Sequence, residues 1–461
     1  MAMGKRKPRQ ESLFVATDRL LPSTGHPFYQ RLNDLLAEAS FDPWIEGRCA
    51  ACYDQDTKVG RPSIPPGVYF RMLLVGYFEG IDSQRGIAWR CSDSLSLRAF
   101  LGVPLDQGTP DHSTLSNTRQ RLPAEVFDEV FQFVLGIAEA KDLIAGKTVG
   151  VDSTTLEANA AMKSIVRKDT GEDWKGYLVR LMREQGVIEP GEEPTDEEVR
   201  RFDKKRQDKK VSNAEWESPT DPDATIAKMK DGRTHLAYKA EHVVDLESEL
   251  VLAAEVYSAD AADTATLVES VLEAQLNLSV AGSEAQILEA AADKGYHAAR
   301  TLEEADHFDI RTYIPEPPRA KTMKLSDKPE EQRRAVLNNR RRVKRAKSKA
   351  LQRRRSEVVE RSFAHVCETG GSRRTWLRGL ADVTKRYVIA AAAHNLGRIL
   401  RRLTGVGKPR ALQGPNGASL ADGTAVGWFS RLYWRLARRL ETTSKCLACI
   451  RPHHTIVASN C

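Results

Sequence analysis

The 461-residue chain has little that would tie it to a membrane or to an oxidising compartment. Its longest uninterrupted apolar run, residues 387–393 (YVIAAAA), is far shorter than the ~20 residues that a membrane-spanning helix needs. The first residues, MAMGKRKPRQ, lack the apolar stretch of a secretion signal. Cysteine is scarce, and its seven copies are an odd number that does not suggest a disulfide framework. We therefore expect a cytoplasmic protein with reduced thiols and no membrane partner.

Aromatic residues are also sparse, at 7%, and no internal repeat is apparent. With 41% hydrophobic and 29% charged residues, the composition is that of an ordinary globular protein and excludes a collagen-like, coiled-coil or wholly disordered chain. At ~100–200 residues per domain, the length indicates two to four folded units.

Two C-x-x-C pairs, Cys49 with Cys52 and Cys446 with Cys449, raise the question of a four-thiolate zinc site. The pairs lie far apart in the chain, and the first falls in a stretch containing Trp and Tyr that is typical of packing. We interpret these cysteines as structural thiols, with zinc as the alternative.

The net charge of +7 is unevenly distributed along the chain. Residues 319–355 hold sixteen Lys and Arg against three acidic residues, a local net charge of +13, so the remainder of the chain sums to −6. A block this basic indicates a polyanionic partner, because each neutralised phosphate releases a counterion. A basic linker without a partner is the alternative.

The chain divides into segments that differ in composition and in the spacing of their apolar residues. Residues 1–25 are expected to be a flexible N-terminus, and residues 26–145 carry apolar residues at helical spacing. Within them, Asp111 stands at the N-cap position of a helix that ends near Arg121, after a short turn. This pattern resembles a helix-turn-helix reader of DNA, although a plain packing pair of helices produces the same pattern.

From residue 146 to 404 strands and helices alternate, in the order β-β-β-α-β-α-β. Strands are predicted at 147–159, 234–245, 250–259, 285–296 and 310–317, and helices at 263–278 and 298–307. We expect an α/β (α+β) mixed sheet with flanking helices, preceded by an all-α domain, with insertions at about 167–233 and 319–352. Residues 405–461 form a C-terminal tail with a basic amphipathic helix at 426–440.

Three acidic residues occupy positions from which they can meet at one edge of this sheet. Asp152 lies on the first strand, Asp293 closely follows the fourth, and Glu360 lies on the helix after the basic segment. Carboxylate oxygens suit Mg²⁺, and two such ions roughly 4 Å apart activate the attacking oxygen and stabilise the leaving oxygen in phosphodiester transfer. Glu357, one helical turn before Glu360, is the main rival for the third position. Glu157 and Asp245 are interpreted as hydrogen-bonding residues of strands and turns.

Several long motifs resemble the DDE-class transposases of bacterial insertion sequences. They are GVDSTTLEANAAMKSIVRKDTGEDW, DPDATIAKMKDGRTHLAYKAEHVVD, ADKGYH and ERSFAHVCETGGSRRTWLRG, in that order. The earlier strings RPSIPPGVYFRMLLVGYFEGIDSQRGIAWR and PDHSTLS resemble the helical domain that precedes the family's catalytic core. The resemblance covers roughly residues 26–412.

This resemblance implies an RNase H-like core whose catalytic, metal-binding triad is Asp152, Asp293 and Glu360, with Mg²⁺ as cofactor and Mn²⁺ as a possible substitute. It further implies cleavage at the terminal inverted repeats of an insertion sequence and strand transfer into target DNA. A location at the bacterial nucleoid and a homodimer that synapses two ends follow by the same analogy. Alternatives are a nuclease of the same fold without joining activity and a catalytically silent DNA-binding relic.

The chain departs from the family pattern around the third acid. Relatives often place an Arg four residues before the catalytic Glu and a Lys six residues after it, where this chain has Ser356 and Val366. Arg355 and Arg361 are the substitutes available nearby. Glu360 is preferred to Glu357 because it matches the family's E-R-x-F pattern.

DNA-facing side chains are predicted on both sides of the triad. Trp376 is a candidate for stacking on a displaced base, with core packing as the favoured interpretation, and His297 is interpreted as structural. The predicted phosphate contacts are Lys239, Lys294, Arg340, Arg341, Arg342, Arg355, Arg361, Arg373, Arg374 and Arg378.

Overall fold

The computed structural model describes residues 25–53, 63–189, 191–206, 212–229, 232–318 and 325–412. The N-terminal residues before 25, the expected helix at 426–440, and the pair Cys446 and Cys449 lie outside these ranges. Within them, no helix is long and apolar enough to cross a membrane.

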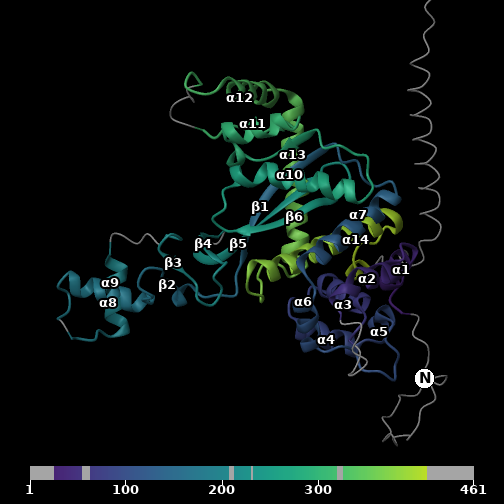
Figure 1. Ribbon diagram of the computed structural model, residues 1–461, viewed down its shortest axis with the longest axis horizontal. Helices are drawn as coiled ribbons and strands as arrows, with labels where there is room; N and C mark the ends of the chain where they lie inside the picture. Colours follow the sequence, from purple (N-terminus) through teal and green to yellow (C-terminus); the bar gives the residue numbers. More distant parts are fainter. Residues whose placement is uncertain are drawn as a thin grey trace, which may run out of the picture.

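The N-terminal region is helical, as predicted, and packs below the sheet in Figure 1. Its most buried helix is α3, which is covered on nearly every side, whereas α1 and α7 bury one apolar face each. Helix α2 buries only three side chains, spaced four residues apart. The helices are α1 (Pro27–Glu38), α2 (Phe41–Cys49), α3 (Pro66–Glu79), α4 (Gln84–Asp93), α5 (Leu95–Leu101), α6 (His112–Arg121) and α7 (Ala124–Ala140), with the short 3-10 helix η2 (Ala50–Cys52).

A mixed sheet forms the centre of the second region. Its strands follow the order β6-β5-β1-β7-β8, and β4 continues the β6 edge by pairing with the start of β5. Strand β5 runs antiparallel to β1 and β6, whereas β7 runs parallel to β1 and β8. The RNase H-like mixed sheet is therefore confirmed. The strands are β1 (Thr148–Glu157), β4 (Thr225–Lys228), β5 (Thr234–Asp245), β6 (Val251–Ser258), β7 (Glu289–Ala291) and β8 (Arg311–Tyr313).

Helices cover both faces of this sheet. Helices α13 (Ala346–Phe363) and α14 (Leu380–Thr404) pack on one face, where the ring of His242 stacks on Phe363 and its Nε2 lies 2.8 Å from the Tyr387 hydroxyl. Helix α10 (Asp263–Val280) packs on the other face and α11 (Ala299–His307) lies beside it. Helix α7 contacts both α14 and α10, so it closes the β6 edge and joins the N-terminal region to the sheet (Figure 1).

The described part of the predicted insertion up to β3 forms a separate arm, seen on the left of Figure 1, whereas β4 near its end joins the central sheet. The arm contains a two-stranded sheet and a small apolar cluster of Leu178, Met182 and Val199. Its elements are the 3-10 helix η3 (Met162–Ser164), β2 (Val166–Arg167), α8 (Trp174–Glu184), α9 (Asp196–Lys205) and β3 (Trp216–Glu217).

The described part of the basic segment folds mainly into helices. Helix α12 (Glu330–Val343) packs on α11 and β8, and α13 follows it after a short turn. Asn339 is buried and bonds to both backbone groups of Ile314, so it extends the hydrogen bonding of the chain beyond β8. The remaining short elements are η4 (Lys294–Tyr296), the π-helix η5 (Ala364–Thr369) that continues α13, and η6 (Pro409–Leu412).

Candidate metal and nucleic-acid site

Asp152 lies in the middle of β1 and faces α13. Successive side chains of a strand point to opposite faces, so Asp152 shares its face with Gly150. A Cβ at Gly150 would lie 3.0 Å from side-chain atoms of both Arg355 and Val359, which shows how closely α13 approaches β1. The absence of a side chain at 150 thus lets the helix pack against the strand beside Asp152.

Asp293 lies beside Asp152 because of the register of two parallel strands. Gly150 of β1 pairs with Ala291 of β7, and each aspartate comes two residues later. The Asp293 carboxylate accepts the Gly295 N–H at 2.7 Å and caps η4. The sheet therefore brings together two of the three predicted acids.

The charge balance at Asp152 is set by burial and by one arginine. Burial raises the pKa of Asp152; the charge of Arg355 opposes this shift, and the charge of Asp293 adds to it. The Arg355 guanidinium donates from Nη1 to Asp152 Oδ2 at 2.6 Å, and the backbone N–H of Ser153 donates to Oδ1 at 2.9 Å. A buried positive group thus accompanies the first aspartate.

Glu360 and its rival Glu357 are both exposed on α13, but their surroundings differ. Glu357 is engaged by Arg354 at 3.4 Å and by Arg361, which also pairs with Glu249. Glu360 forms no ion pair with any residue that the structure describes. It lies one turn after Ser356, whose hydroxyl oxygen accepts from Arg355 Nη2 at 3.3 Å.

The two aspartates fit a hard divalent cation in donor chemistry. Both offer carboxylate oxygens from neighbouring strands, although the Arg355 guanidinium already donates to one oxygen of Asp152. Across the described ranges, no group of three His, Cys, Asp or Glu side chains converges at metal-binding distance, so Glu360 is not drawn in with the two aspartates.

The predicted phosphate contacts separate into exposed and engaged groups. Four of the engaged arginines pair with the protein itself: Arg340 with Glu316, Arg342 with the backbone oxygen of Thr312, Arg355 with Asp152, and Arg361 with Glu249 and Glu357. Exposed positions are held by Lys294, Arg341, Arg374 and Arg378.

Lys239 lies in the interior, on the face opposite Asp152, although it was predicted to meet phosphate. It is 4% exposed, and its ammonium lies 2.8 Å from Asp263 Oδ1 and 2.9 Å from Thr266 Oγ1. The alternation along β5 explains this placement, because Lys239 and Glu241 point to one face and His242 to the other.

Arg373 and Arg374 are held beside the end of β1 by backbone hydrogen bonds. The Glu157 N–H donates to Arg373 O at 2.9 Å, and the Thr375 N–H donates to Glu157 O at 2.9 Å. Arg373 Nη1 also donates to Thr154 Oγ1 at 2.9 Å, on the face of Asp152. Arg374 and Arg378 line an open pocket of about 500 Å³ at this strand end.

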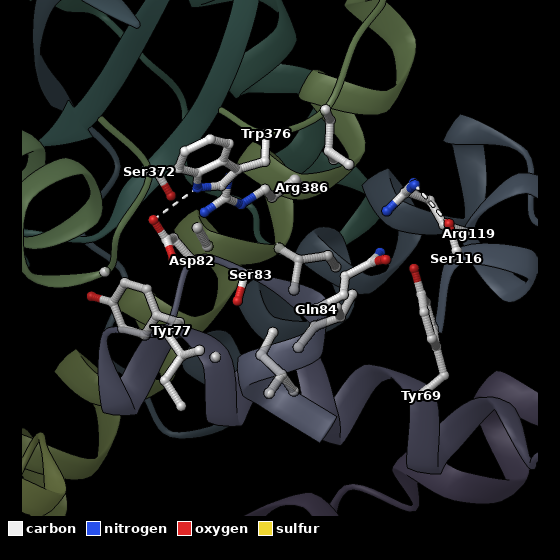
Figure 2. A pocket seen from close by; sticks show the side chains of 18 of the residues that line it. Tyr69, Tyr77, Asp82, Ser83, Gln84, Ser116, Arg119, Ser372, Trp376 and Arg386 are labelled. Atoms are coloured by element: carbon white, nitrogen blue, oxygen red, sulfur yellow. Dashed lines mark hydrogen bonds between the residues drawn. The ribbon is translucent and has the colours of Figure 1, made fainter. Parts of the chain in front are cut away.

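Trp376 is not a core residue, which corrects the interpretation favoured from the sequence. It is 47% exposed, and its Nε1 donates to Asp82 Oδ2 at 2.9 Å (Figure 2). The Arg374 guanidinium lies over its ring. His297 is buried, as expected of a structural residue.

Asp245 and the first C-x-x-C pair lie within the described residues. Asp245 accepts hydrogen bonds from the backbone of Ala145, Gly146 and Glu247, as expected of a turn residue. Cys49 is buried in the N-terminal helical core, whereas Cys52 is partly exposed.

Figure 2 shows a pocket of about 320 Å³ where the helical region meets the loop after η5. Tyr69 and Tyr77 of α3 contribute to one side, and Trp376 and Arg386 to another. Arg119 of α6 pairs with Asp382 of α14 at 3.2 Å. The two regions are thus joined by specific polar contacts as well as by apolar packing.

The capped helix after Asp111 forms as predicted. Asp111 accepts the Thr114 N–H at 2.8 Å, and this hydrogen bond, with those from Ser113 and Thr114 hydroxyls, lowers its pKa to about 2. Leu115, Thr118 and Arg119 face the interior of the protein. The outward face of α6 is polar and carries His112, Ser113, Asn117, Gln120 and Arg121.

Sequence reasoning missed the residues that tie the two aspartates to the far side of the sheet. Ser153, next to Asp152, donates from Oγ to Asp263 Oδ1 at 3.0 Å, and Tyr296, three residues after Asp293, donates to Glu241 Oε2 at 2.8 Å. Nothing in the spacing of these residues signals the contact, because it depends on β5 and α10 meeting behind β1. Only the shared face of Lys239 and Glu241 follows from the sequence, because the two residues are two positions apart on one strand.

Comparison with known proteins gave two family matches. Residues 15–121 match a family model described as "Transposase domain (DUF772)", and residues 196–396 match one described as "Transposase DDE domain". Together the two matches cover about two thirds of the chain; Asp293 and Glu360 lie inside the second, whereas Asp152 precedes it. No curated protein and no solved structure is significantly similar to the chain.

Proposed function

Since the chain belongs to the DDE-class transposases of insertion sequences, we propose that it cleaves DNA at the terminal inverted repeats of its own element and joins the freed ends to target DNA. The observation that supports this most directly is the pair Asp152 and Asp293, placed side by side by the register of β1 and β7. Glu360, unpaired among the described residues on the adjoining helix, is the third acid of the proposal.

The chemistry consists of two phosphodiester displacements at one site. In the first, a water oxygen attacks the phosphorus at the element end, the bond to the 3′ oxygen breaks, and a 3′-hydroxyl is released. In the second, this hydroxyl attacks a target phosphodiester, and the target's own 3′ oxygen leaves. Magnesium ions bound at the carboxylates would lower the pKa of the attacking group and stabilise the leaving oxygen, and Mn²⁺ would substitute.

The residues of this chain orient the reaction. Asp152 and Asp293 supply the oxygen ligands, and Arg355 holds the Asp152 carboxylate from the α13 side. Lys294, next to Asp293, and Arg373, bonded to Thr154, would meet the phosphates of the strand being cut. No serine, tyrosine or cysteine nucleophile is required, because each displacement is made by water or by a DNA hydroxyl.

Glu360 is preferred to Glu357 on the basis of their contacts. Glu357 is held by Arg354 and Arg361, so its carboxylate is already compensated within the protein. Glu360 forms no such pair among the described residues and shares a helical stripe with Ser356 beside Arg355. Two chains would be required to hold two element ends, and we propose a homodimer for that step.

The test is a cleavage and strand-transfer assay on terminal-repeat DNA with the full chain. We expect Asp152→Asn, Asp293→Asn and Glu360→Gln each to abolish cleavage and joining while DNA binding remains, because each removes a metal ligand and no phosphate contact. Glu357→Gln is the matched control and should retain activity. Activity in Glu360→Gln together with loss in Glu357→Gln would reverse the third assignment.

The same assay separates the alternatives. A nuclease without joining activity would give cut ends and no joined product, and a silent relic would bind DNA without cutting it. Either result with the unmodified chain would overturn the proposed function.

A further inference from the structure

Helix α10 carries an apolar stripe on its outer surface. Val268, Leu272, Leu276 and Val280 follow one another at intervals of four residues, which places them along one side of the helix. Leu276 and Val280 are 51% and 57% exposed, and Phe308, just after α11, is 49% exposed. An open groove of about 450 Å³ lies along this stripe between α10 and Phe308. Exposed apolar side chains gathered along a groove are a feature of interaction sites.

The groove is bordered by acidic residues. Glu269 and Glu273 of α10 and Glu304 of α11 line it, and Glu304 pairs with Arg300 at 2.7 Å. Glu269 and Glu273 form no ion pair within the described part of the chain. Burial and then Glu273 raise the pKa of nearby Glu255 to about 7 and that of Asp128 to about 6. The surface therefore combines exposed apolar groups with uncompensated negative charge.

This combination selects the chemistry of the partner. DNA is excluded because its phosphates carry the same sign of charge as the groove. A partner that matches both properties is an amphipathic segment with apolar residues on one side and arginines on the other.

One segment of this chain has that pattern. Residues 426–440 have the sequence VGWFSRLYWRLARRL and contain four arginines and no acidic residue. Phe429, Leu432, Leu436 and Leu440 recur at intervals of three and four, which is the spacing of one helix face. These residues lie outside the described ranges.

The chain beyond α14 is long enough to reach this groove. Asn395 of α14 bonds to both backbone groups of Val251, and Asn277 of α10 donates to Leu252 O at 3.1 Å. The two helices contact adjacent residues of β6 from opposite faces of the sheet, so the connecting residues must pass around the sheet to reach the groove. The intervening residues 413–425 can span up to ~45 Å when extended, at ~3.5 Å per residue.

We propose that residues 426–440 bind the groove between α10 and α11 of the same chain. Their apolar side covers Leu272, Leu276, Val280 and Phe308, and their arginines face Glu269 and Glu273. This inference does not depend on the proposed function, since it concerns the face of the sheet that does not carry Asp152.

The first test is a photo-cross-link in the full chain. A photoreactive phenylalanine analogue at position 276 should cross-link to a peptide within 426–440, and the product should migrate as a monomer. The matched control is the same analogue at Val187, which is 54% exposed on the arm and should give no product with that segment. A product of dimer size, a product with another region, or no product from position 276 would each overturn the proposal.

The second test uses charge. Arg431→Glu combined with Arg435→Glu should reduce the cross-link yield from position 276 at least fivefold, because four like charges would then face one another. Adding Glu269→Arg and Glu273→Arg to that variant should restore most of the yield. Reduced yield without restoration would show that the variants disturb the fold rather than a specific pairing, and it would count against the proposal.

Discussion

The two faces of the central sheet differ in charge and in solvent access, although they are built from alternate residues of the same strands. On the α13 face, Asp152 is about a quarter exposed and is accompanied by Arg355, with Arg373 nearby. On the α10 face, Lys239 and Glu241 are buried and fully engaged with their neighbours. The strand pleat thus separates a partly open carboxylate site from a closed polar network.

This difference shows what each set of charges does. The closed network is satisfied within the fold: Glu241 accepts hydrogen bonds from Thr266, Ser270 and Tyr296. Buried charges of this kind are tolerated because every partner is present. Asp152 keeps solvent access and has a like-charged neighbour in Asp293, which suits the cation-binding role that we propose for it.

The largest effect should follow from breaking the closed network. We expect Lys239→Met to lower the free energy of unfolding by about 3–5 kcal/mol, because it leaves Glu241 and Asp263 without their cation. Chemical denaturation of the full chain measures this. Lys294→Met, at an exposed position, is the control and should change stability by less than about 0.5 kcal/mol. Equal effects of the two variants on stability would contradict the difference that we describe between the two faces.

Removing Arg355 from the α13 face should lower the free energy of unfolding by a smaller amount. Arg355→Met should lower the free energy of unfolding by about 1–2 kcal/mol at pH 7, because Asp152 can still be solvated. Arg355 lowers the pKa of Asp152 against the effect of burial, so its removal raises that pKa further. The charged form then becomes unfavourable in the folded state, and the stability deficit should grow as the pH rises from 4 to 7. A deficit that is largest at pH 4 would contradict this assignment.

A single acid beside the network should make the protein less stable at high pH. The pKa of Glu255 is raised to about 7, chiefly by burial and then by Glu273, from the ordinary value of 4.5. A group with a raised folded pKa contributes stability that is present below its unfolded pKa and lost as the pH rises through the folded one. Glu255→Gln should therefore stabilise the protein by about 1–3 kcal/mol at pH 8 and by almost nothing at pH 4. Thermal unfolding at both pH values gives the comparison.

The smallest effect on stability, and the clearest effect on DNA binding, is expected from exposed cations. Neutralising Arg341, Lys344, Arg345, Lys349 and Arg353, which are all exposed on or beside α12 and α13, should leave stability almost unchanged. Binding to all DNA sequences should weaken about equally. The slope of log K against log salt should fall by up to ~0.9 for each phosphate that the protein no longer neutralises.

Two further variants sharpen that result. The matched variant neutralises the engaged residues Arg340 and Arg342. It should lower the stability of the protein, and it should change the salt slope less than neutralising the exposed set does. Sequence preference should survive in both sets, because we expect it to depend on the outward face of α6. Loss of sequence discrimination with unchanged general affinity in the exposed set would show that α12 and α13 read bases.

The basic segment shows which of its properties could be predicted from the sequence. Its charge count indicated a polyanionic partner, but the count does not separate arginines that face solvent from those that pair within the fold. Arg340, Arg342 and Arg355 find partners on segments 24, 30 and 203 residues away. Only packing of α12 and α13 on the sheet decides which cations remain exposed.

The amino-acid sequence by itself determined the order of the core strands and helices, the cap at Asp111 and the positions of Asp152 and Asp293 on and just after core strands, because hydrophobic periodicity and capping act over a few residues. Tertiary structure alone decided that Asp152 meets Arg355, that Lys239 is buried and that Trp376 is exposed. These outcomes depend on strand register and on which helix covers which face. Both are set by contacts between residues far apart in the chain, which include the pairs Asp152 with Arg355 and Trp376 with Asp82, each more than a hundred positions apart.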